Sequence, residues 1–456
     1  MKNKDLYIVI GLGLTGLSCA RFLSRQKLPF VVMDTRDAPP NLEAFRQQYP
    51  GVDVYTGKHW PQAVLNDAKC LVVSPGVAIA TPCIQEAQKH GVEILGDIEL
   101  FARFNRVPVI AITGANGKST VTTLVGEMAK ASGKKVAVVG NIGTPVLDAF
   151  HDQQDASLIV MELSSFQLET TSSLQPIAAT VLNITPDHLD RYDSFADYAA
   201  AKHRIYKGAQ HAIINLQDPL SDSEEIKVPT QRQYFTLAEP QKGQWGLRMQ
   251  DNVCWLAHGE TLLLPTTDMR MFGQHNFANA LSALALGHAA GLPMDKMLQA
   301  LRTFSGLAHR CQSVAEKNQV KWINDSKGTN IGACQAALEG IGKQLPGKIV
   351  LLLGGDGKGA DFNDLAPMVT QFCRRIIVMG KDTPLIKQAL AHKVDTSIAN
   401  NMIDAVEIAH QTAKAGDVVL LSPACSSLDQ YRDFTHRGDT FVEAVKRILH
   451  TDANAS

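Results

Sequence analysis

A glycine-rich loop in the middle of the chain could bind the phosphates of a nucleotide. The loop TGANGKST occupies residues 113–120, after an apolar run and before a stretch with helical character. The backbone N–H groups of such a loop form a nest for phosphate oxygens, the Lys118 ammonium reaches the terminal phosphates, and the Ser119 hydroxyl can bind Mg²⁺. The strict P-loop pattern has a glycine five residues before Gly117, where this chain has Ile112. The loop is therefore a variant of that motif.

Two apolar runs of the same region end in polar groups that suit a metal ion. The run at 158–162 ends in Glu162, and a second run leads to Asp187, His188 and Asp190. A carboxylate at a strand end commonly supports the Mg²⁺ of a bound nucleotide. Taken singly, His188 is typical of a structural or surface histidine, and Asp190 is typical of a helix cap. We include His188 in the site because it accompanies Glu162 and the glycine-rich loop.

A second glycine-rich loop near the N-terminus is typical of a dinucleotide or nucleotide diphosphate site. Residues 11–16 read GLGLTG after an apolar run, and Asp34 ends the next apolar run. Glycines permit a tight turn against a diphosphate, the following helix N-terminus favours negative charge, and an acid can accept ribose hydroxyls. Arg36 beside Asp34 would also suit the 2′-phosphate of NADP. The alternative is a glycine turn that only packs a strand against a helix.

Three polar loops in the last third of the chain predict a second ligand-binding edge. They are NDSKGTN at 324–330, GGDGK at 354–358 and SPACSS at 422–427, each after an apolar run. The carboxyl ends of parallel strands line a common crevice, so the three loops should converge there. Lys327 and Lys358 favour a small anionic ligand or phosphates. The alternative is a set of turns rich in small polar residues that bind no ligand.

The chain length of 456 residues and the spacing of its glycine-rich loops predict three α/β domains. We place them at residues 1–96, 97–305 and 306–456. The first and last are expected to be Rossmann-like. The central one is expected to be of the P-loop type, with a small antiparallel sheet over 231–269 and a helix over 276–290.

The charge balance and the cysteines exclude several classes of protein. With 44 Lys and Arg residues against 45 Asp and Glu residues, the net charge is −1, so no global positive field attracts nucleic acid. The eight cysteines show neither a C-x-x-C pair nor zinc spacing, which favours a reducing compartment. The apolar stretch at 6–20 is broken by glycines and too short for a membrane helix, and its loop argues against a signal peptide. We expect a cytoplasmic monomer that binds neither nucleic acid nor membrane.

Seven motifs, in order, make the chain resemble the Mur ligase family. They are TGANGKST at 113–120, ELSSFQLE at 162–169, NITPDHLD at 183–190, AKHR at 201–204, GQHN at 273–276, HR at 309–310 and NDSKGT at 324–329. Within the family, GLGLTGL at 11–17, MDTR at 33–36 and LSPACSSLD at 421–429 are similar to the members that add D-glutamate. The resemblance overturns the dinucleotide interpretation, because the first domain of these enzymes holds the UDP part of the substrate.

The resemblance implies an ATP-dependent amide ligase of peptidoglycan precursor synthesis with one substrate for each domain. Its substrates would be UDP-N-acetylmuramoyl-L-alanine, ATP and D-glutamate, joined through an acyl phosphate. The implied UDP-substrate contacts are Leu14, Thr15, Thr35, Arg36, Gly76 and Asn141. The implied ATP contacts are Gly114, Ala115, Asn116, Gly117, Lys118, Ser119, Thr120, Asn279, Arg310 and Asp325. The implied D-glutamate contacts are Lys327, Thr329, Lys358, Ser427, Leu428 and Phe434.

The resemblance also implies two Mg²⁺ sites and a modified lysine. The metal ligands would be Ser119, Glu162, His188 and Lys202, and the catalytic groups Lys118, Glu162, His188 and Lys202. Lys202 is carbamylated in relatives, which is chemically reasonable because a neutral amine can add CO₂ and become a carboxylate-like ligand, the reverse of its usual charge. From the residues alone, Lys202 would be a cation on a helix surface.

Three other interpretations remain at this point. One is a ligase for a different amino acid, or a folylpolyglutamate synthase; the loop at 422–428 argues against it, as does the absence of the DNPR motif of diaminopimelate- or lysine-adding members. A second is an NADP-dependent oxidoreductase fused to an NTPase, which depends only on the first glycine loop and Arg36. A third is an inactive binding protein, which the presence of Lys118, Glu162, His188 and Lys202 disfavours.

Overall fold

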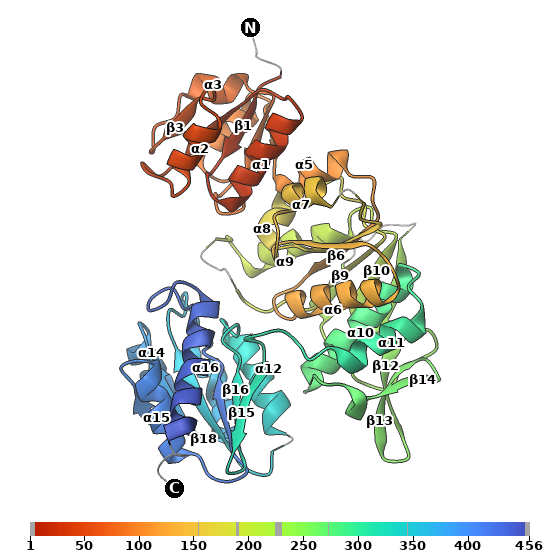
Figure 1. Cartoon of the computed structure of the whole chain (residues 1–456), viewed down its shortest axis with the longest axis vertical. Helices are drawn as coiled ribbons and strands as arrows, with labels where there is room; N and C mark the ends of the chain where they lie inside the picture. Colours follow the sequence, from red (N-terminus) through yellow and green to blue (C-terminus); the bar gives the residue numbers. More distant parts are fainter. Residues whose placement is uncertain are drawn as a thin grey trace. The chain divides into compact units, whose positions relative to one another are not determined.

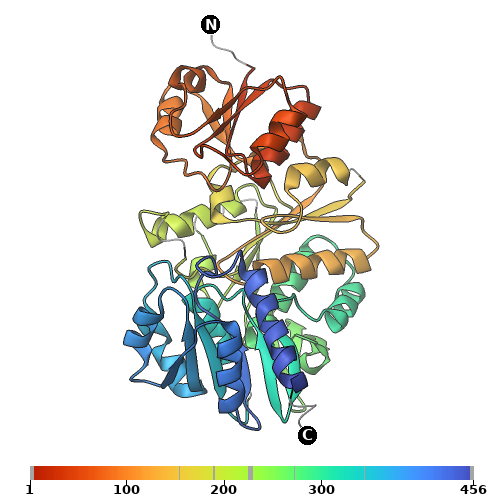
Figure 2. The same cartoon turned by 60° about the vertical axis from the view of Figure 1, so that its left-hand side comes forward.

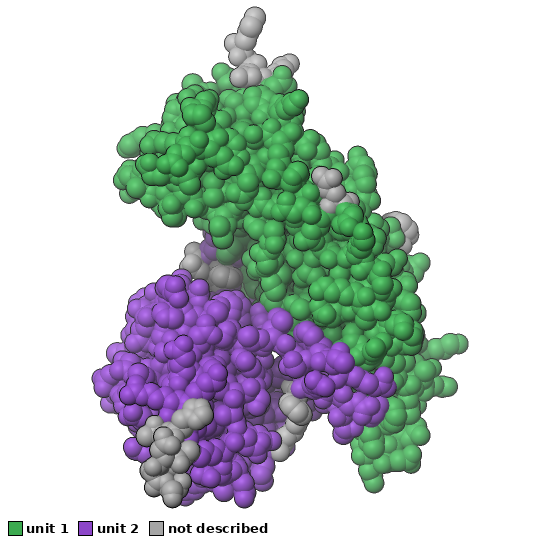
Figure 3. All heavy atoms as spheres, in the orientation of Figure 1, with its two compact units in different colours: residues 1–184, 194–264, 280–301 green, residues 185–193, 265–279, 302–456 purple. Residues whose placement is uncertain are grey.

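The computed structural model describes residues 5–153, 155–187, 191–223, 230–271, 273–343 and 345–451. The described chain divides into two compact units (Figure 3). Unit 1 comprises Met1–Ile184, Ser194–Leu264 and Ala280–Leu301, and unit 2 comprises Thr185–Asp193, Pro265–Asn279 and Arg302–Ser456. The border expected at residue 305 lies near the start of the last segment of unit 2, whereas the border expected at residue 96 falls inside unit 1.

The first sheet of unit 1, which includes β1 and β3 as labelled in Figure 1, is parallel. Within the described residues its strand order is β3-β2-β1-β4-β5. Its strands are β1 (Tyr7–Ile10), β2 (Phe30–Asp34), β3 (Val54–Thr56), β4 (Cys70–Val73) and β5 (Glu93–Leu95), joined by helices α1 (Leu14–Arg25), α2 (Leu42–Gln48), α3 (Gln62–Asp67) and α4 (Pro82–Lys89). β1 and β4 are buried throughout, as expected for central strands of a parallel sheet. The chain changes direction across the sheet between β1 and β4, so the loops after these two strands line a crevice.

The second sheet of unit 1 contains the glycine-rich loop at 113–120. Among the described residues its order is β14-β13-β12-β11-β10-β9-β6-β8-β7. The strands are β6 (Val109–Thr113), β7 (Val136–Gly140), β8 (Leu158–Glu162), β9 (Ala178–Val181), β10 (His211–Asn215), β11 (Gln231–Phe235), β12 (Trp245–Gln250), β13 (Val253–His258) and β14 (Thr261–Pro265).

The small antiparallel sheet expected over 231–269, attached to the middle domain, is confirmed for β12 and β13 but not for β11. β11 pairs in parallel with β10, and the antiparallel pairing begins only between β12 and β13. The short strands therefore extend the central sheet. The physical reason is that β10 would otherwise leave a row of unpaired N–H and C=O groups at its edge.

Seven further helices accompany this sheet in the described part of the chain. They are α5 (Asp97–Phe104), α6 (Lys118–Ala131), α7 (Val146–Asp152), α8 (Ser165–Glu169), α9 (Phe195–His203), α10 (Gln274–Ala289) and α11 (Met294–Thr303). The helix expected over 276–290 is α10. Short 3₁₀ turns occur at η1 (Arg204–Tyr206), η2 (Pro219–Ser221), η3 (Thr266–Asp268) and η4 (Phe362–Leu365).

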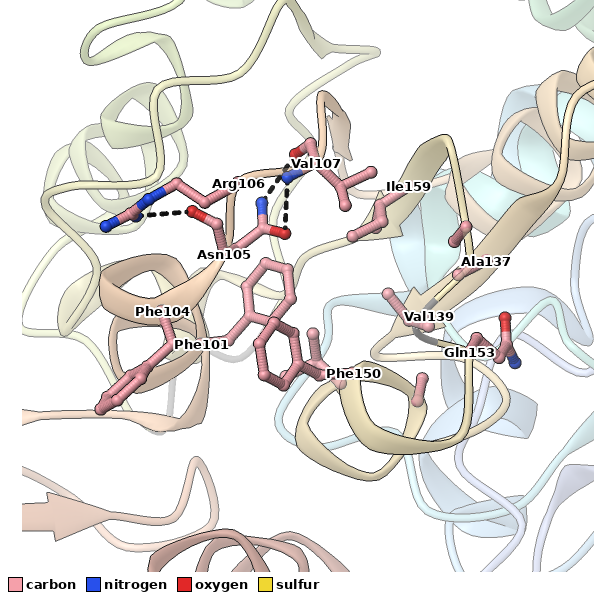
Figure 4. A pocket seen from close by; sticks show the side chains of 13 residues that line it. Phe101, Phe104, Asn105, Arg106, Val107, Ala137, Val139, Phe150, Gln153 and Ile159 are labelled. Carbon is pink, nitrogen blue, oxygen red and sulfur yellow. Dashed lines mark hydrogen bonds between the residues drawn. The ribbon is translucent and has the colours of Figure 1, made fainter. Parts of the chain in front are cut away.

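An apolar cavity of about 310 Å³ lies beside α5, α7 and β7 in unit 1 (Figure 4). Phe101, Val139 and Phe150 line it, and Asn105 at the end of α5 closes a loop against Val107 by accepting its N–H at 3.0 Å and donating to its carbonyl at 2.7 Å. Helix α5 begins at Asp97, and Phe101, about one turn later in the same helix, lines this cavity.

Unit 2 contains a six-stranded sheet with two apolar faces. In the described residues its order is β15-β16-β20-β17-β18-β19, and neighbouring strands are parallel except β15 with β16. The strands are β15 (Gln312–Lys317), β16 (Val320–Asn324), β17 (Ile349–Gly354), β18 (Cys373–Met379), β19 (Asp395–Ile398) and β20 (Val418–Leu421), and the helices are α12 (Ile331–Gly342), α13 (Ala366–Phe372), α14 (Thr383–Leu390), α15 (Met402–Thr412) and α16 (Phe434–Thr451).

The side chains of β17 alternate between these two faces. Leu351 and Leu353 join the core formed with α12, α13 and α14, whereas Val350 and Leu352 join the core formed with α15 and α16. Figure 2 shows the blue helix α16 along one face of the sheet. In the described part of the chain, no helix combines the length and the apolarity that a membrane crossing requires.

Candidate active site

The loop between β6 and α6 is held in place by Asn183, which follows β9. The N–H groups of Ala115 and Asn116 donate to the Asn183 carbonyl and to its Oδ1, both at 2.8 Å, and Asn183 Nδ2 donates to the Asn116 carbonyl at 3.1 Å. Gly117 has a φ of +82°, a left-handed conformation that glycine adopts without strain. It offers no capping side chain to α6, and such a helix N-terminus is a site for anions. Asn183 is not among the residues predicted from the sequence, although it begins the NITP motif.

Two lysine amines converge on one carbonyl oxygen of this loop. Lys118 Nζ donates to the carbonyls of Gly114 and Ala115, and Lys202 Nζ donates to the Gly114 carbonyl, each at 2.9 Å. The Nζ atoms are thus within about 6 Å of each other, a distance at which two positive charges repel and negative charge between them is favoured. Lys202 comes from α9, is 2% exposed and lies 4.6 Å from the Tyr198 ring centroid. Lys202 is therefore a buried residue of α9 that contacts the glycine-rich loop, and not a cation of the helix surface.

Glu162, at the end of β8, has a buried carboxylate oxygen that no described group satisfies. Its side chain is almost fully buried, Oε1 accepts a hydrogen bond from Asn141 Nδ2 at 2.9 Å, and Oε2 has no hydrogen-bond partner in the described residues. Glu162 is in register with Ile112 of β6, so it lies beside the start of the loop. An unpaired buried carboxylate oxygen is costly, and it is a donor that Mg²⁺ prefers.

The donors near the loop fit a magnesium ion that is bound together with nucleotide phosphates. Ser119 lies in the first turn of α6 and Glu162 ends β8. Over the described ranges, the structure forms no group of three or more His, Cys, Asp and Glu side chains that could hold a metal ion by itself. Mg²⁺ commonly takes one or two carboxylates and completes its shell with phosphates and water. His188 lies outside the described residues.

A cavity of about 590 Å³ opens at the crevice between β1 and β4. All six expected UDP-substrate residues line it: Leu14, Thr15, Thr35, Arg36, Gly76 and Asn141. Asn141 also donates to Glu162, so it connects this cavity with the carboxylate beside the phosphate loop. A Cβ atom on Gly16 would lie 1.8 Å from the Gly11 carbonyl oxygen, so only glycine lets α1 start this close to the first glycine loop.

Asp34 organises the rim of this cavity through contacts within the protein. Its Oδ2 accepts the Leu12 N–H at 2.7 Å and Arg36 Nη2 at 2.6 Å, and its Oδ1 accepts both the N–H and Nε of Arg36 at 2.9 Å. Burial acts to raise the pKa of Asp34, but the hydrogen bonds from Arg36 and Leu12 bring it below its ordinary value. The carboxylate that could accept ribose hydroxyls instead orients Arg36 and the glycine loop.

The residues expected to contact D-glutamate all belong to unit 2. Five of the six lie in or near the loops that follow β16, β17 and β20, which are adjacent strands, and Phe434 begins α16. Buried Arg437 of α16 joins two of these loops, because its Nη2 and Nε donate to the Ser326 carbonyl and Oγ at 2.8 and 3.0 Å and its Nη1 donates to the Cys425 carbonyl at 3.1 Å. Burial lowers the pKa of Arg437 to about 10. Arg437 is not among the residues predicted from the sequence.

Lys358 already holds a carboxylate in the structure. Its Nζ donates to Asp187 Oδ1 at 2.8 Å, while Asn330 Nδ2 donates to Asp187 Oδ2 at 3.4 Å. In the loop after β16, the Lys327 ammonium lies 4.1 Å from the Phe434 ring centroid. Ser427 is buried, whereas Leu428 is exposed. Lys358 is therefore placed to pair with a carboxylate, and its contact with D-glutamate stays a prediction.

Three of the expected ATP residues lie in unit 2, whereas the glycine-rich loop lies in unit 1. Asn279 Nδ2 donates to Asn276 Oδ1 at 3.1 Å. Asp325 accepts Ser422 Oγ at 2.7 Å and the Cys311 N–H at 3.2 Å, and burial raises its pKa to about 6. Arg310, the third, follows the buried residue His309 and acts to lower that pKa by its charge.

A variant P-loop with converging amines and a carboxylate at the neighbouring strand end is typical of α/β proteins that bind nucleotide phosphates. Three family domains match the chain in order: Mur ligase MurD-like, N-terminal domain at 5–96, Mur ligase middle domain at 112–287, and Mur ligase, glutamate ligase domain at 309–425. The chain belongs to the Mur ligase family.

Relatives match nearly the whole chain. The UDP-N-acetylmuramoylalanine–D-glutamate ligase of Legionella pneumophila (strain Paris) is 51% identical over 445 residues, 97% of this chain and 99% of the relative. The enzyme of the same name from Pseudomonas aeruginosa is 51% identical over 441 residues, 97% of this chain and 98% of the relative.

Solved structures share the fold at low sequence identity. The UDP-N-acetylmuramate–alanine ligase of Thermotoga maritima has a TM-score of 0.60 at 17% identity and covers 98% of this chain and 99% of its own. MurF from Acinetobacter baumannii has a TM-score of 0.59 at 17% identity and covers 97% of this chain and 90% of its own.

Proposed function

We propose that the chain is an ATP-dependent amide ligase that adds D-glutamate to UDP-N-acetylmuramoyl-L-alanine, a step of peptidoglycan precursor synthesis. One observation carries the proposal: Lys118, Lys202 and the carboxylate of Glu162, which has an unpaired oxygen, all lie at the glycine-rich loop 113–120. Asn141 donates to Glu162 and also lines the cavity of about 590 Å³. The names of the relatives at 51% identity support the choice of substrates.

The proposal gives each sequence region one substrate. Residues 1–96 would bind the UDP part of the acceptor, residues 97–305 would bind ATP, and residues 306–456 would bind D-glutamate. Arg36, held by Asp34, provides positive charge at the rim of the cavity. Lys358 provides it for a glutamate carboxylate, in place of its present contact with Asp187.

The reaction has two steps, because a carboxylate is a poor electrophile. An oxygen of the alanyl carboxylate attacks the γ-phosphorus of ATP. The bond between this phosphorus and the oxygen that bridges to the β-phosphate breaks, so ADP leaves and an acyl phosphate forms. The amine of D-glutamate then adds to the acyl carbon. Collapse of the tetrahedral intermediate expels inorganic phosphate, and loss of the proton from nitrogen completes the amide. Lys118 would stabilise negative charge on the transferred phosphoryl group, and His188 would orient the reacting groups.

Magnesium would be held at two sites by Ser119, Glu162, His188 and Lys202, the last as a carbamate. When bound, Mg²⁺ neutralises the phosphate charge that develops during transfer. The position of Lys202 supports the carbamate, because its Nζ is buried against the Gly114 carbonyl and a carbamate formed there would lie beside the loop expected to bind the phosphates. The carbamate would replace a positive charge by a negative one at this position.

We also propose that the enzyme is cytoplasmic, because its substrates ATP and a nucleotide sugar are cytoplasmic metabolites. We further propose that it is a monomer. None of the eight cysteines, which all lie in the described ranges, forms a disulfide, and this suits a reducing compartment. Size-exclusion chromatography with light scattering tests the oligomeric state.

The test is phosphate release from ATP in the presence of UDP-N-acetylmuramoyl-L-alanine and one of four amino acids. We expect turnover with D-glutamate and little or none with L-glutamate, L-lysine or diaminopimelate. Turnover that does not depend on D-glutamate would refute the specific assignment. Turnover with another of the four would instead identify a ligase for that amino acid.

A further inference from the structure

Two buried carboxylates at the start of α5 differ in how well the protein satisfies them. Glu99 is fully engaged: Oε2 accepts the N–H groups of Ser172 and Ser173 at 2.7 and 3.0 Å, and Oε1 accepts Ser173 Oγ at 2.9 Å and Arg103 Nε at 3.2 Å. Burial acts to raise the pKa of Glu99, and these hydrogen bonds bring it below its ordinary value. Glu99 therefore has a structural role that its contacts explain.

Asp97, two residues earlier, lacks such partners. It is 4% exposed, its Oδ1 has no hydrogen-bond partner in the described residues, and its Oδ2 receives only a long 3.5 Å contact from Gln167 Nε2 among side chains. Burial raises the pKa of Asp97 to about 6, although the Ile98 N–H and Gln167 act in the opposite direction. A buried acceptor that the protein leaves unpaired needs a partner from elsewhere.

The fold fixes Asp97 in the wall of the cavity that the first glycine loop also lines. Asp97 and Gln167 both contribute to this wall, together with Asn141. A Cβ atom on Gly96 would lie 2.4 Å from Thr170 Oγ1, so the backbone before Asp97 packs closely against the end of α8. Gln167 is itself oriented by a capping box, in which its Oε1 accepts the Ser164 N–H at 3.1 Å and its N–H donates to Ser164 Oγ at 3.2 Å.

We infer that Asp97 is a specificity-determining residue for the acceptor substrate, and that its unpartnered Oδ1 accepts a hydrogen bond from an N–H or O–H group of the N-acetylated sugar. This inference rests on the proposed function, which supplies a nucleotide sugar as the ligand of the cavity. A phosphate is excluded as the partner, because it offers no donor and would repel a carboxylate. The diphosphate instead matches the glycine loop and Arg36, at other residues of the same wall.

The favourable position of an acid at a helix N-terminus does not account for Asp97. An exposed side chain at the first helical position would gain that interaction without the cost of burial. A bound water could also satisfy Oδ1, and in that case the residue would not distinguish one nucleotide ligand from another. The experiment therefore has to compare ligands with and without the sugar.

The test measures dissociation constants by calorimetry for UDP-N-acetylmuramoyl-L-alanine and for UDP, with the full chain. We expect Asp97→Ala to weaken binding of the nucleotide sugar by roughly 10- to 100-fold, the effect of losing a hydrogen bond to a charged group, and to leave UDP binding unchanged. Asp97→Asn should weaken it less, because its amide oxygen still accepts. The matched control Glu99→Gln should lower the unfolding temperature but change neither dissociation constant.

Each outcome separates this inference from the proposed function. Equal binding of the nucleotide sugar by wild type and Asp97→Ala would overturn the inference alone, and so would an equal loss for UDP and for the nucleotide sugar. If wild type binds the nucleotide sugar no better than UDP, the proposed function fails as well. A loss confined to the nucleotide sugar would support both.

Discussion

Replacing Glu162 by glutamine should stabilise the magnesium-free protein and strongly reduce its activity. Glutamine keeps the shape of the side chain and the hydrogen bond that Asn141 Nδ2 donates at 2.9 Å. It replaces the buried, unpartnered Oε2 by a neutral NH₂ group. Stability without magnesium rises and activity falls, because the unpaired Oε2 destabilises the folded chain and, in the proposed mechanism, binds Mg²⁺.

The magnitude follows from the burial of the carboxylate. An unpaired buried neutral group costs about 1–3 kcal/mol and a charged one costs more, so the magnesium-free variant should gain about 1 kcal/mol and its unfolding midpoint should rise by about 2–4 °C. Wild type should gain about 2.7 kcal/mol when Mg²⁺ and a non-hydrolysable ATP analogue are present at about 100 times their dissociation constant, and Glu162→Gln should lose most of this gain. Phosphate release should fall by about 10²–10³-fold.

Thermal unfolding in EDTA and in Mg²⁺ with the nucleotide analogue measures these shifts. Glu127→Gln is the control, because Glu127 of α6 is an exposed carboxylate whose contact with Lys130 lies on the surface. It should behave like wild type in both conditions. The reasoning is refuted if Glu162→Gln unfolds at a lower temperature than wild type in EDTA and retains the full magnesium-dependent increase.

Four further changes test other parts of the site. Lys202→Ala should lose activity and regain part of it in acetate, which can replace the carbamate; an activity that acetate does not change would contradict the carbamate. Lys358→Met should raise the KM for D-glutamate by about 10–100-fold and leave the KM for ATP unchanged, measured by initial rates. Arg437→Leu removes the donor to three buried acceptors, the Ser326 carbonyl and Oγ and the Cys425 carbonyl. It should lower the free energy of unfolding of unit 2, measured in urea, by about 2–4 kcal/mol; an unchanged urea midpoint would show that these hydrogen bonds do not stabilise unit 2. Burial lowers the pKa of His275 to about 4, so the unfolded chain binds a proton more readily than the folded chain, and the free energy of unfolding falls as the pH drops from 6.5 toward 4. His275→Gln should reduce this fall by up to about 3 kcal/mol, measured by urea unfolding from pH 7 to 4.

Much of the phosphate site was predictable from the sequence because its parts are local. The TGANGKST loop, its lysine and the helix after it are consecutive, so their order along the chain defines the nest. Glu162 could be predicted because it ends an apolar run, and parallel strands end at a common edge. The same rule placed the loops after β16, β17 and β20 together.

Other features could not be predicted, because burial and pairing are properties of the folded chain. Nothing in the residues around Lys202 indicates that its amine is buried against the Gly114 carbonyl, 88 positions away. Asp97 and Glu99 are two acids in one short helix, and only their surroundings show that one is satisfied and the other is not. The antiparallel sheet expected over 231–269 depended on strand composition, which does not specify the partner of β11.

The sequence by itself thus determined the motifs, the α/β class and the resemblance to the Mur ligases, since each depends on neighbouring residues and their order. The tertiary structure alone decided which charged groups lie within reach of one another and which are removed from water. Asp34, expected as an acceptor of ribose hydroxyls, binds the Arg36 side chain in the folded chain. Lys202, expected on a helix surface, is buried and donates to the glycine-rich loop. The physical reason is that the free energy of a charge depends on its solvation and on its partners, and both are set by segments distant in the chain.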